Sequence, residues 1–160
     1  MLLAKIKPKN IAIYTDISLN KTENFGIGIR IRDLDRDILL WNHGLKFNFK
    51  EHYPKNTYTL TTINAELEGI IQAINTTIGR YGQSRSLHLM IHTDIRQAQS
   101  FLKRYRGTDP LVLRYIRLIK RARKKHIITF IILSDQTRDK FDFPDHASVH
   151  NIARRMRGLV

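Results

Sequence analysis

The feature that most limits the fold is a succession of three strand-like segments near the start of the chain. Residues 10–16 (NIAIYTD) are rich in apolar and β-branched side chains, and residues 25–32 (FGIGIRIR) alternate with a period of two. Residues 38–41 (ILLW) form the third segment. The stretches between them, SLNKTEN and DLDRD, are short and turn-like, so the pattern predicts an antiparallel meander.

Helical and strand-like patterns alternate in the rest of the chain. Isoleucine and leucine recur at three- and four-residue spacing between residues 63 and 78, which predicts a helix. Residues 127–133 (IITFIIL) are almost all apolar, as is typical of a strand buried on both faces. The other expected elements are a strand over 87–91, a helix over 95–105, a helix after Pro110 and a closing helix over 145–156.

This order of elements predicts a single α/β domain. Three leading antiparallel strands, followed by alternating helices and strands, favour one five-stranded mixed sheet flanked by helices. The chain has 160 residues, 42% of them hydrophobic, which is enough for one core and too little for two ordinary domains. We therefore expect residues 1–160 to form one domain.

The chain carries a large excess of positive charge. It has 28 Lys and Arg residues against 14 Asp and Glu, with a formal net charge of +14 and a pI near 10.4. Such an excess favours a polyanionic partner, because each phosphate that a cation neutralises releases condensed counterions. The alternative is a basic protein whose charge only keeps it in solution. No membrane partner is expected, since no long uncharged apolar run occurs.

Two further features bear on the cellular compartment. Cysteine is absent, which excludes a disulfide framework, a thiolate zinc site and a cysteine nucleophile. The first residues, MLLAKIKPKN, have only a short apolar stretch before Lys5, so no signal peptide is expected. We expect an intracellular protein of the cytoplasm or nucleus rather than a secreted one.

Three acidic residues are expected to meet at one edge of the sheet. Asp16 closes the first strand-like segment, Asp94 closes the fourth, and Glu66 lies in the first turns of the first helix. If the first and fourth strands are parallel neighbours, their ends lie side by side. Close carboxylates repel one another unless a cation neutralises them, so the trio predicts a site for Mg²⁺ or Mn²⁺ that acts on phosphate. Taken singly, each acid could instead cap a turn or complement a helix dipole.

The helix after Pro110 has a basic side that ends in the run KRARKK at 120–125. This density favours a nucleic-acid contact that positions the polymer without reading its sequence. A nuclear localisation signal or a solvated helix face would give the same pattern. The candidate nucleic-acid-binding residues on this helix are Arg117, Lys120, Arg121, Lys124 and Lys125.

Four short motifs resemble those of type 1 ribonuclease H. The chain has TDIS at 15–18, NAEL at 64–67, TDI-x-x-A at 93–98 and V-H-x-I-A-R at 149–154. They stand where that family has TDGS, an AEL-like helix, TDS-x-x-A and A-D-x-L-A-R. The order of the elements is also that of the family, and the NAEL helix looks closest to the retroelement type.

The resemblance implies a ribonuclease H-like fold and hydrolysis of the RNA strand of RNA/DNA hybrids. Asp16, Glu66 and Asp94 would then be catalytic and would hold two divalent ions, Mg²⁺ or Mn²⁺, while Ser18 would lie against the nucleic acid. A free-standing protein and part of a larger reverse-transcribing polyprotein would share these motifs. Two alternatives stay open: a nucleic-acid-binding domain whose site has decayed, and a DNA-directed nuclease of the resolvase or transposase type.

The fourth acid of the family pattern is replaced by His150. This residue follows His146 by four positions, so both lie on one helix face. We expect His150 to be catalytic as a ligand of the second metal ion; a proton shuttle and a residue that only fills the vacated ligand site are the alternatives. A zinc site of the two histidines is not expected, because no third soft ligand is evident. Ile17 and Ile95 also replace a glycine and a serine of the family.

Overall fold

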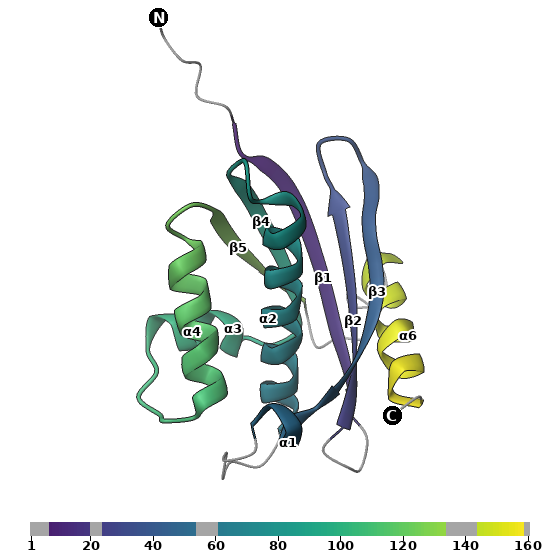
Figure 1. The fold of residues 1–160 in the computed structure, drawn as a ribbon, viewed down its shortest axis with the longest axis vertical. Coiled ribbons are helices and arrows are strands. Elements are labelled where there is room, and N and C mark those ends of the chain that lie inside the picture. Colours follow the sequence, from purple (N-terminus) through teal and green to yellow (C-terminus); the bar gives the residue numbers. More distant parts are fainter. Residues whose placement is uncertain (1–6, 20–23, 54–60, 134–143, 159–160) are drawn as a thin grey trace, which may run out of the picture.

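A mixed five-stranded sheet forms the centre of the described structure, which comprises residues 7–19, 24–53, 61–133 and 144–158 (Figure 1). The strands of this computed structural model are β1 (Lys9–Leu19), β2 (Asn24–Asp33), β3 (Ile38–Asn48), β4 (Leu87–Thr93) and β5 (Ile127–Ile132). Their order is β3-β2-β1-β4-β5. Neighbours among the first three strands pair antiparallel, and β4 is parallel to β1 and β5. The predicted meander and mixed sheet are confirmed.

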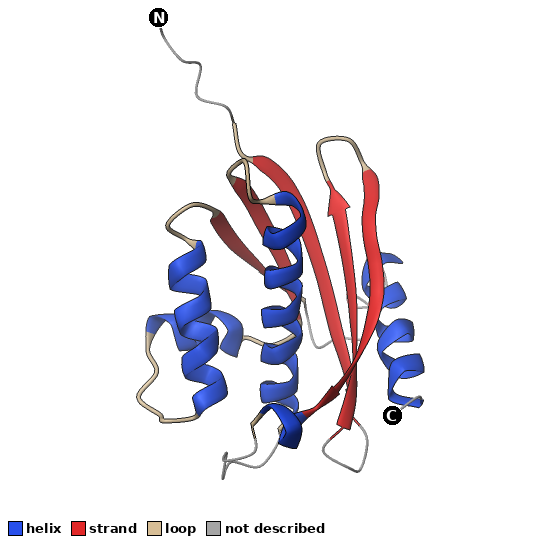
Figure 2. Ribbon diagram, viewed as in Figure 1, coloured by secondary structure: helices blue, strands red, loops and turns tan. Residues whose placement is uncertain are grey.

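Helices cover both faces of the sheet. They are α1 (Phe49–His52), α2 (Thr62–Tyr81), α3 (Gln97–Lys103), α4 (Pro110–Ala122) and α6 (Pro144–Gly158). α2 and α4 lie on one face and α6 on the other (Figures 1 and 2). The sequence pattern does not predict the single turn α1, and it overestimates α3, which begins at Gln97 and ends at Lys103.

The main core lies between the sheet and α2. Ile13 and Ile27 are fully buried, and they belong to the same apolar cluster as Ile70 of α2. Burying a side chain of this size contributes roughly 1.5–3 kcal/mol. Gly69 allows the close approach of α2 to β1, because a Cβ at this position would lie 2.8 Å from Thr15 Oγ1.

Two glycines of β2 receive α6 on the opposite face. A Cβ at Gly28 would lie 2.1 Å from the carbonyl oxygen of Val149, and one at Gly26 would lie 2.1 Å from that of Ala153. Real Cβ atoms do not approach other atoms so closely. The backbone of α6 therefore rests directly on the backbone of β2, and any side chain at these positions would move the helix.

Ionic contacts hold the first turn of α6 against the same strand. Asp145 accepts hydrogen bonds from Arg30 Nε and from Arg32 Nη2, the latter at 2.9 Å, and Arg30 also donates to Ser148 Oγ at 2.9 Å. Burial opposes ionisation of Asp145, but the hydrogen bonds and charges of the two arginines outweigh it and lower the pKa of this carboxyl. The charged pair of arginines thus fixes where α6 begins on the sheet.

Three strands differ from the sequence-based predictions. The sequence pattern predicts β3 over residues 38–41, but the strand continues to Asn48, because this longer stretch pairs with β2. β1 does not end at Asp16 but continues to Leu19, because this part of the strand still pairs with β2. The prediction that residues 127–133 are buried on both faces is wrong. β5 is an edge strand in which only alternate residues, Ile128 and Phe130, are buried, while Ile127 is 51% exposed. An apolar run alone does not distinguish a central strand from an edge strand.

A buried histidine predicts a pH dependence of stability. His126 is 5% exposed, and its Nδ1 accepts the backbone N–H of Leu87 at 3.0 Å, which requires the unprotonated nitrogen. Burial, with a smaller contribution from Lys125, lowers the pKa of His126 below its ordinary value. Because the unfolded chain binds the proton more tightly, this contribution is present above pH ~6.5 and is lost as the pH falls below it.

We expect the free energy of unfolding to decline between pH 7 and pH 5, by at most about 1.4 kcal/mol per pH unit for this residue. Urea titrations across this range measure the decline. His126→Asn keeps an acceptor for the Leu87 N–H but does not titrate, so its decline should be shallower. An unchanged slope in this variant would show that other groups cause the pH dependence.

Candidate metal centre

The three predicted acids lie together. One carboxylate oxygen from each of Asp16, Glu66 and Asp94 lies within 4.8 Å of the other two. Asp16 and Glu66 are each 3% exposed, and Asp94 is half-buried. Asp16 lies within β1, Asp94 directly follows β4, and Glu66 is on α2. Three segments that are far apart in the sequence thus build one carboxylate cluster.

The pairing of β1 with β4 explains how the two aspartates meet. The parallel ladder between these strands ends with Tyr14 opposite His92, two residues before each aspartate. Beyond this pair β1 remains bonded only to β2, with Asp16 opposite Gly28. The aspartates therefore emerge from neighbouring strands at the place where the ladder between them ends.

The start of α2 is fixed by polar contacts, and this places Glu66. The side chain of Thr61 caps the helix by accepting the N–H of Asn64 at 3.1 Å. The Asn64 side chain in turn donates to Asp109 Oδ2 at 2.7 Å, and the other oxygen of Asp109 caps α4 by accepting the N–H of Leu111 at 2.9 Å. Both helices therefore start from one buried polar cluster beside the carboxylates.

This donor set fits a hard divalent cation. Mg²⁺ and Mn²⁺ prefer oxygen ligands, and three close carboxylates without a cation repel one another. Asp16 Oδ1 accepts the backbone N–H of Ile17 at 2.9 Å, which fixes the orientation of the carboxylate. The cluster can hold divalent ions; the side chains alone do not select between magnesium and manganese.

Two histidines of α6 face Asp16 from the other side. His150 Nδ1 lies 2.7 Å from Asp16 Oδ2, and His146 Nε2 lies 3.9 Å from the same oxygen. His146 is fully buried, whereas the His150 side chain is 31% exposed. His150 therefore lies where the sequence predicts it, at the edge of the carboxylate cluster. The proximity of His146 to Asp16 was not predicted, although its four-residue spacing from His150 is the signal for it.

The other predicted site residues are not among the side chains that meet in this cluster. Ser18 is on β1 and 8% exposed. The basic residues are exposed on α4 and on the turn after it, and Lys125 Nζ donates to the carbonyl oxygens of Gly82 and Gln83 at 2.8 and 2.7 Å. Ile17, which replaces the family glycine, is 8% exposed and belongs to the main core. The structure therefore separates the carboxylates from the basic helix.

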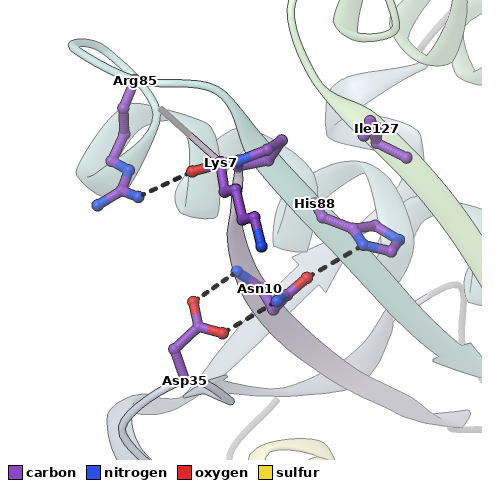
Figure 3. A pocket seen from close by; sticks show the side chains of 7 residues that line it. Lys7, Asn10, Asp35, Arg85, His88 and Ile127 are labelled. Atoms are coloured by element: carbon purple, nitrogen blue, oxygen red, sulfur yellow. Dashed lines mark hydrogen bonds between the residues drawn. The ribbon is translucent and has the colours of Figure 1, made fainter. Parts of the chain in front are cut away.

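A polar pocket of about 460 Å³ lies near the starts of β1 and β4, away from the carboxylates (Figure 3). Its polar groups bond to one another. Asp35 accepts from the backbone N–H and the side chain of Asn10 at 3.0 and 2.9 Å, and His88 Nδ1 lies 3.1 Å from Asn10 Oδ1. Lys7 and Arg85 also line it (Figure 3). The carboxylate of Asp35 offsets their charge, so this pocket offers no purely cationic site.

Sequence comparison and structure comparison give different results. No protein-family model matches the chain, and no curated protein matches it by sequence. Among the described residues, no helix is both long enough and apolar enough to cross a membrane. The folds of solved ribonucleases H, in contrast, match over nearly the whole chain.

Three of these structures illustrate the match. Ribonuclease H1 of the halophilic archaeon Halobacterium salinarum is 12% identical, with a TM-score of 0.64 over 94% of this chain and 99% of that one. LC11-RNase H1, solved in complex with an RNA/DNA hybrid, is 15% identical, with a TM-score of 0.63 over 91% and 97%. The RNase H domain of prototype foamy virus is 12% identical, with a TM-score of 0.60 over 95% of each chain. The predicted ribonuclease H-like fold is confirmed.

Proposed function

We propose that this chain, which has the fold of type 1 ribonucleases H, is a metal-dependent endonuclease that cleaves the RNA strand of RNA/DNA hybrids. The observation that carries the proposal is the buried cluster of Asp16, Glu66 and Asp94 at the end of the β1–β4 ladder. The fold supports a nucleic-acid hydrolase in general, and one similar structure holds an RNA/DNA hybrid. The net charge of +14 suits a polyanionic substrate.

Asp16, Glu66, Asp94 and His150 would hold two divalent ions, Mg²⁺ or Mn²⁺. When bound, such a pair lowers the pKa of a water molecule and stabilises the charge that develops on the phosphate. The chain supplies the geometry for this chemistry: the Ile17 N–H orients Asp16, and the rigid start of α2 holds Glu66 beside it. Preorganised ligands of this kind cost no rearrangement during the reaction.

His150 has two roles open to it within this proposal. Its Nδ1 lies at hydrogen-bond distance from Asp16, so the imidazole either binds the second ion directly or holds Asp16 in place for it. A site that has lost its activity because His150 replaces an acid is the main alternative. In that case the chain would be a nucleic-acid-binding domain with a ribonuclease H fold.

The proposal includes nucleic-acid contacts outside the metal centre. Ser18 lies two residues beyond Asp16 on the same strand, so it is a candidate contact near the scissile strand. Arg117, Lys120, Arg121, Lys124 and Lys125 are exposed and would bind phosphates. The prototype foamy virus protease-reverse transcriptase contains a matching fold over 21% of its length. A place within a larger reverse-transcribing polyprotein, acting inside the cell, is therefore part of the proposal.

The experiment is a cleavage assay on labelled RNA/DNA hybrid, duplex DNA and duplex RNA, in Mg²⁺ and separately in Mn²⁺. We expect the protein to cleave the hybrid alone. The cleavage rate should fall by at least about a hundredfold in Asp16→Asn, because removing even a residue that only supports a metal ligand lowers activity by 10–100-fold. His150→Asp is compared in the same assay. Activity that appears only in His150→Asp would support the decayed site, and salt-sensitive binding without cleavage in all forms would support the binding domain. Cleavage of duplex DNA alone would favour a DNA-directed nuclease.

A further inference from the structure

A groove between α2 and α4 is lined by cations. Its first part, of about 310 Å³, is lined by Ile71, Asn75, Arg114, Arg117, Leu118 and Arg121. A second part, of about 220 Å³, shares Asn75, Leu118 and Arg121 with the first and adds Lys125 near its far end. The two hollows adjoin each other through these three shared residues, and together they are called the α2–α4 groove. No acidic side chain is among the residues that line either part.

The cations of the groove differ in their availability. Arg114 donates to the buried carboxylate of Glu68 at 3.2 Å, and the amine of Lys125 is bonded to two backbone carbonyls. Arg117 and Arg121 are exposed, and neither has an ion-pair partner among the residues that the structure describes. The first two cations are thus partly neutralised or held by the protein, which leaves Arg117 and Arg121 to bind an external anion.

The groove and the metal centre lie on different sides of α2. Glu66 points from this helix toward Asp16 in the sheet, whereas the groove opens between α2 and α4. Asn75, in the middle of the groove, is nine residues beyond Glu66, or about 13 Å along the helix axis. An anion bound by Arg117 and Arg121 is therefore not the phosphate held at the carboxylates.

The lining chemistry indicates a phosphate backbone rather than exposed bases. Proteins that bind single strands usually stack the bases on aromatic side chains. No Phe, Tyr or Trp lines either part of the groove, and the one aromatic ring there, that of His126, is only 5% exposed. Guanidinium groups bind phosphate oxygens of any sequence, often with two parallel hydrogen bonds. This combination suits the backbone of a double helix, whose bases are already stacked on one another.

We propose that the α2–α4 groove binds the sugar–phosphate backbone of double-helical nucleic acid, at a site separate from the metal centre. Arg117 and Arg121 are its contacts, whereas Lys120 and Lys124 line neither part of the groove and would meet phosphates outside it. The inference deepens the proposed function, in which all of these residues are candidate contacts. This inference rests on the proposed function in one respect, namely that the partner is a nucleic acid.

The test compares two double variants of the same basic segment. Arg117→Gln with Arg121→Gln removes the two groove cations that are available to a ligand, and Lys120→Gln with Lys124→Gln removes the same charge beside the groove. Binding of labelled RNA/DNA hybrid and of single-stranded RNA is measured by fluorescence anisotropy in EDTA, over a range of salt concentrations. The cleavage rate of bound hybrid is then measured with enzyme in excess, in Mg²⁺ or Mn²⁺.

We expect the groove variant to bind the hybrid at least about tenfold more weakly, with a log–log salt slope shallower by up to about 1.8, or 0.9 for each lost phosphate contact. The lysine variant should lose less affinity for the hybrid, because its two cations lie outside the groove. Equal losses in the two variants, or a loss confined to single strands, would overturn the proposal. A slower rate for bound hybrid in the groove variant would place the arginines at the scissile strand and overturn the separate site.

These outcomes remain distinct from failure of the proposed function. If the wild-type protein cleaves nothing, the nuclease proposal fails, but the anisotropy measurements in EDTA still decide whether the groove binds a duplex. If the wild-type protein cleaves the hybrid and the groove variant binds it normally, the nuclease proposal stands and the groove proposal fails. Thermal unfolding of each variant tests whether the substitution leaves the fold intact.

Discussion

Gly28→Ala is expected to destabilise the protein by about 3 kcal/mol, at the upper end of the cost of overpacking a core. The added Cβ would lie 2.1 Å from the carbonyl oxygen of Val149, which belongs to helix backbone and cannot rotate away as a side chain can. α6 must therefore shift on the sheet, and His146 and His150 shift with it. For a domain of this size the loss corresponds to a fall of about 6–12 °C in the melting temperature.

Gly79→Ala is the matched control for this change. Gly79 lies in α2, and a Cβ at this position would meet nothing within 4 Å. Alanine is favoured over glycine in a helix by about 1 kcal/mol, so this variant should melt at the same or a slightly higher temperature. Differential scanning calorimetry measures both variants. If Gly28→Ala melted like the wild type, α6 would not rest on β2 as described.

Glu66→Gln is expected to abolish the stabilisation of the protein by Mg²⁺ or Mn²⁺. An ion that binds only the folded chain stabilises it by about 2.7 kcal/mol at one hundred times its dissociation constant, which raises the melting temperature by about 5–10 °C. Without the ion, the variant should melt above the wild type, because one of three mutually repelling carboxylates has become neutral. The variant should therefore melt above the wild type without the ion and below it with the ion. A general loss of packing would lower the melting temperature under both conditions.

Glu51→Gln serves as the control for removal of a negative charge. Glu51 is an exposed acid of α1, outside the carboxylate cluster, so this variant should keep the full response to divalent ions. Thermal scans with and without each ion, together with calorimetric titration of Mn²⁺, give the comparison. A wild-type protein whose melting temperature ignores both ions would contradict the metal centre itself.

The local patterns of the sequence predict most of the fold. Period-two alternation identifies β2, and the three- and four-residue spacing of isoleucines identifies α2, because each pattern reflects one buried face. The same reasoning fails for β5, since its apolar run does not show that the strand lies at the sheet edge with Ile127 exposed. The position of a strand within a sheet depends on long-range pairing, which no local pattern contains.

The candidate site is predictable to a similar extent. Asp16, Glu66 and Asp94 could be placed together because strand ends and helix starts converge in α/β sheets. The spacing of His146 from His150 puts both on one helix face, but the 3.9 Å approach of His146 to Asp16 also depends on how closely α6 packs on β2. This packing distance is set by Gly26 and Gly28, which in the sequence look like ordinary small residues of an alternating strand.

The buried bond between Asn64 and Asp109 has a consequence for where a substrate would be cut. It joins the start of α2 to the residue that caps α4, so the helix that carries Glu66 is bonded directly to the helix that carries the groove arginines. A duplex held at Arg117 and Arg121 would then meet the carboxylates at a constant offset. The two helices would then set the distance along the hybrid between the bound backbone and the phosphate that is cut, whatever the base sequence.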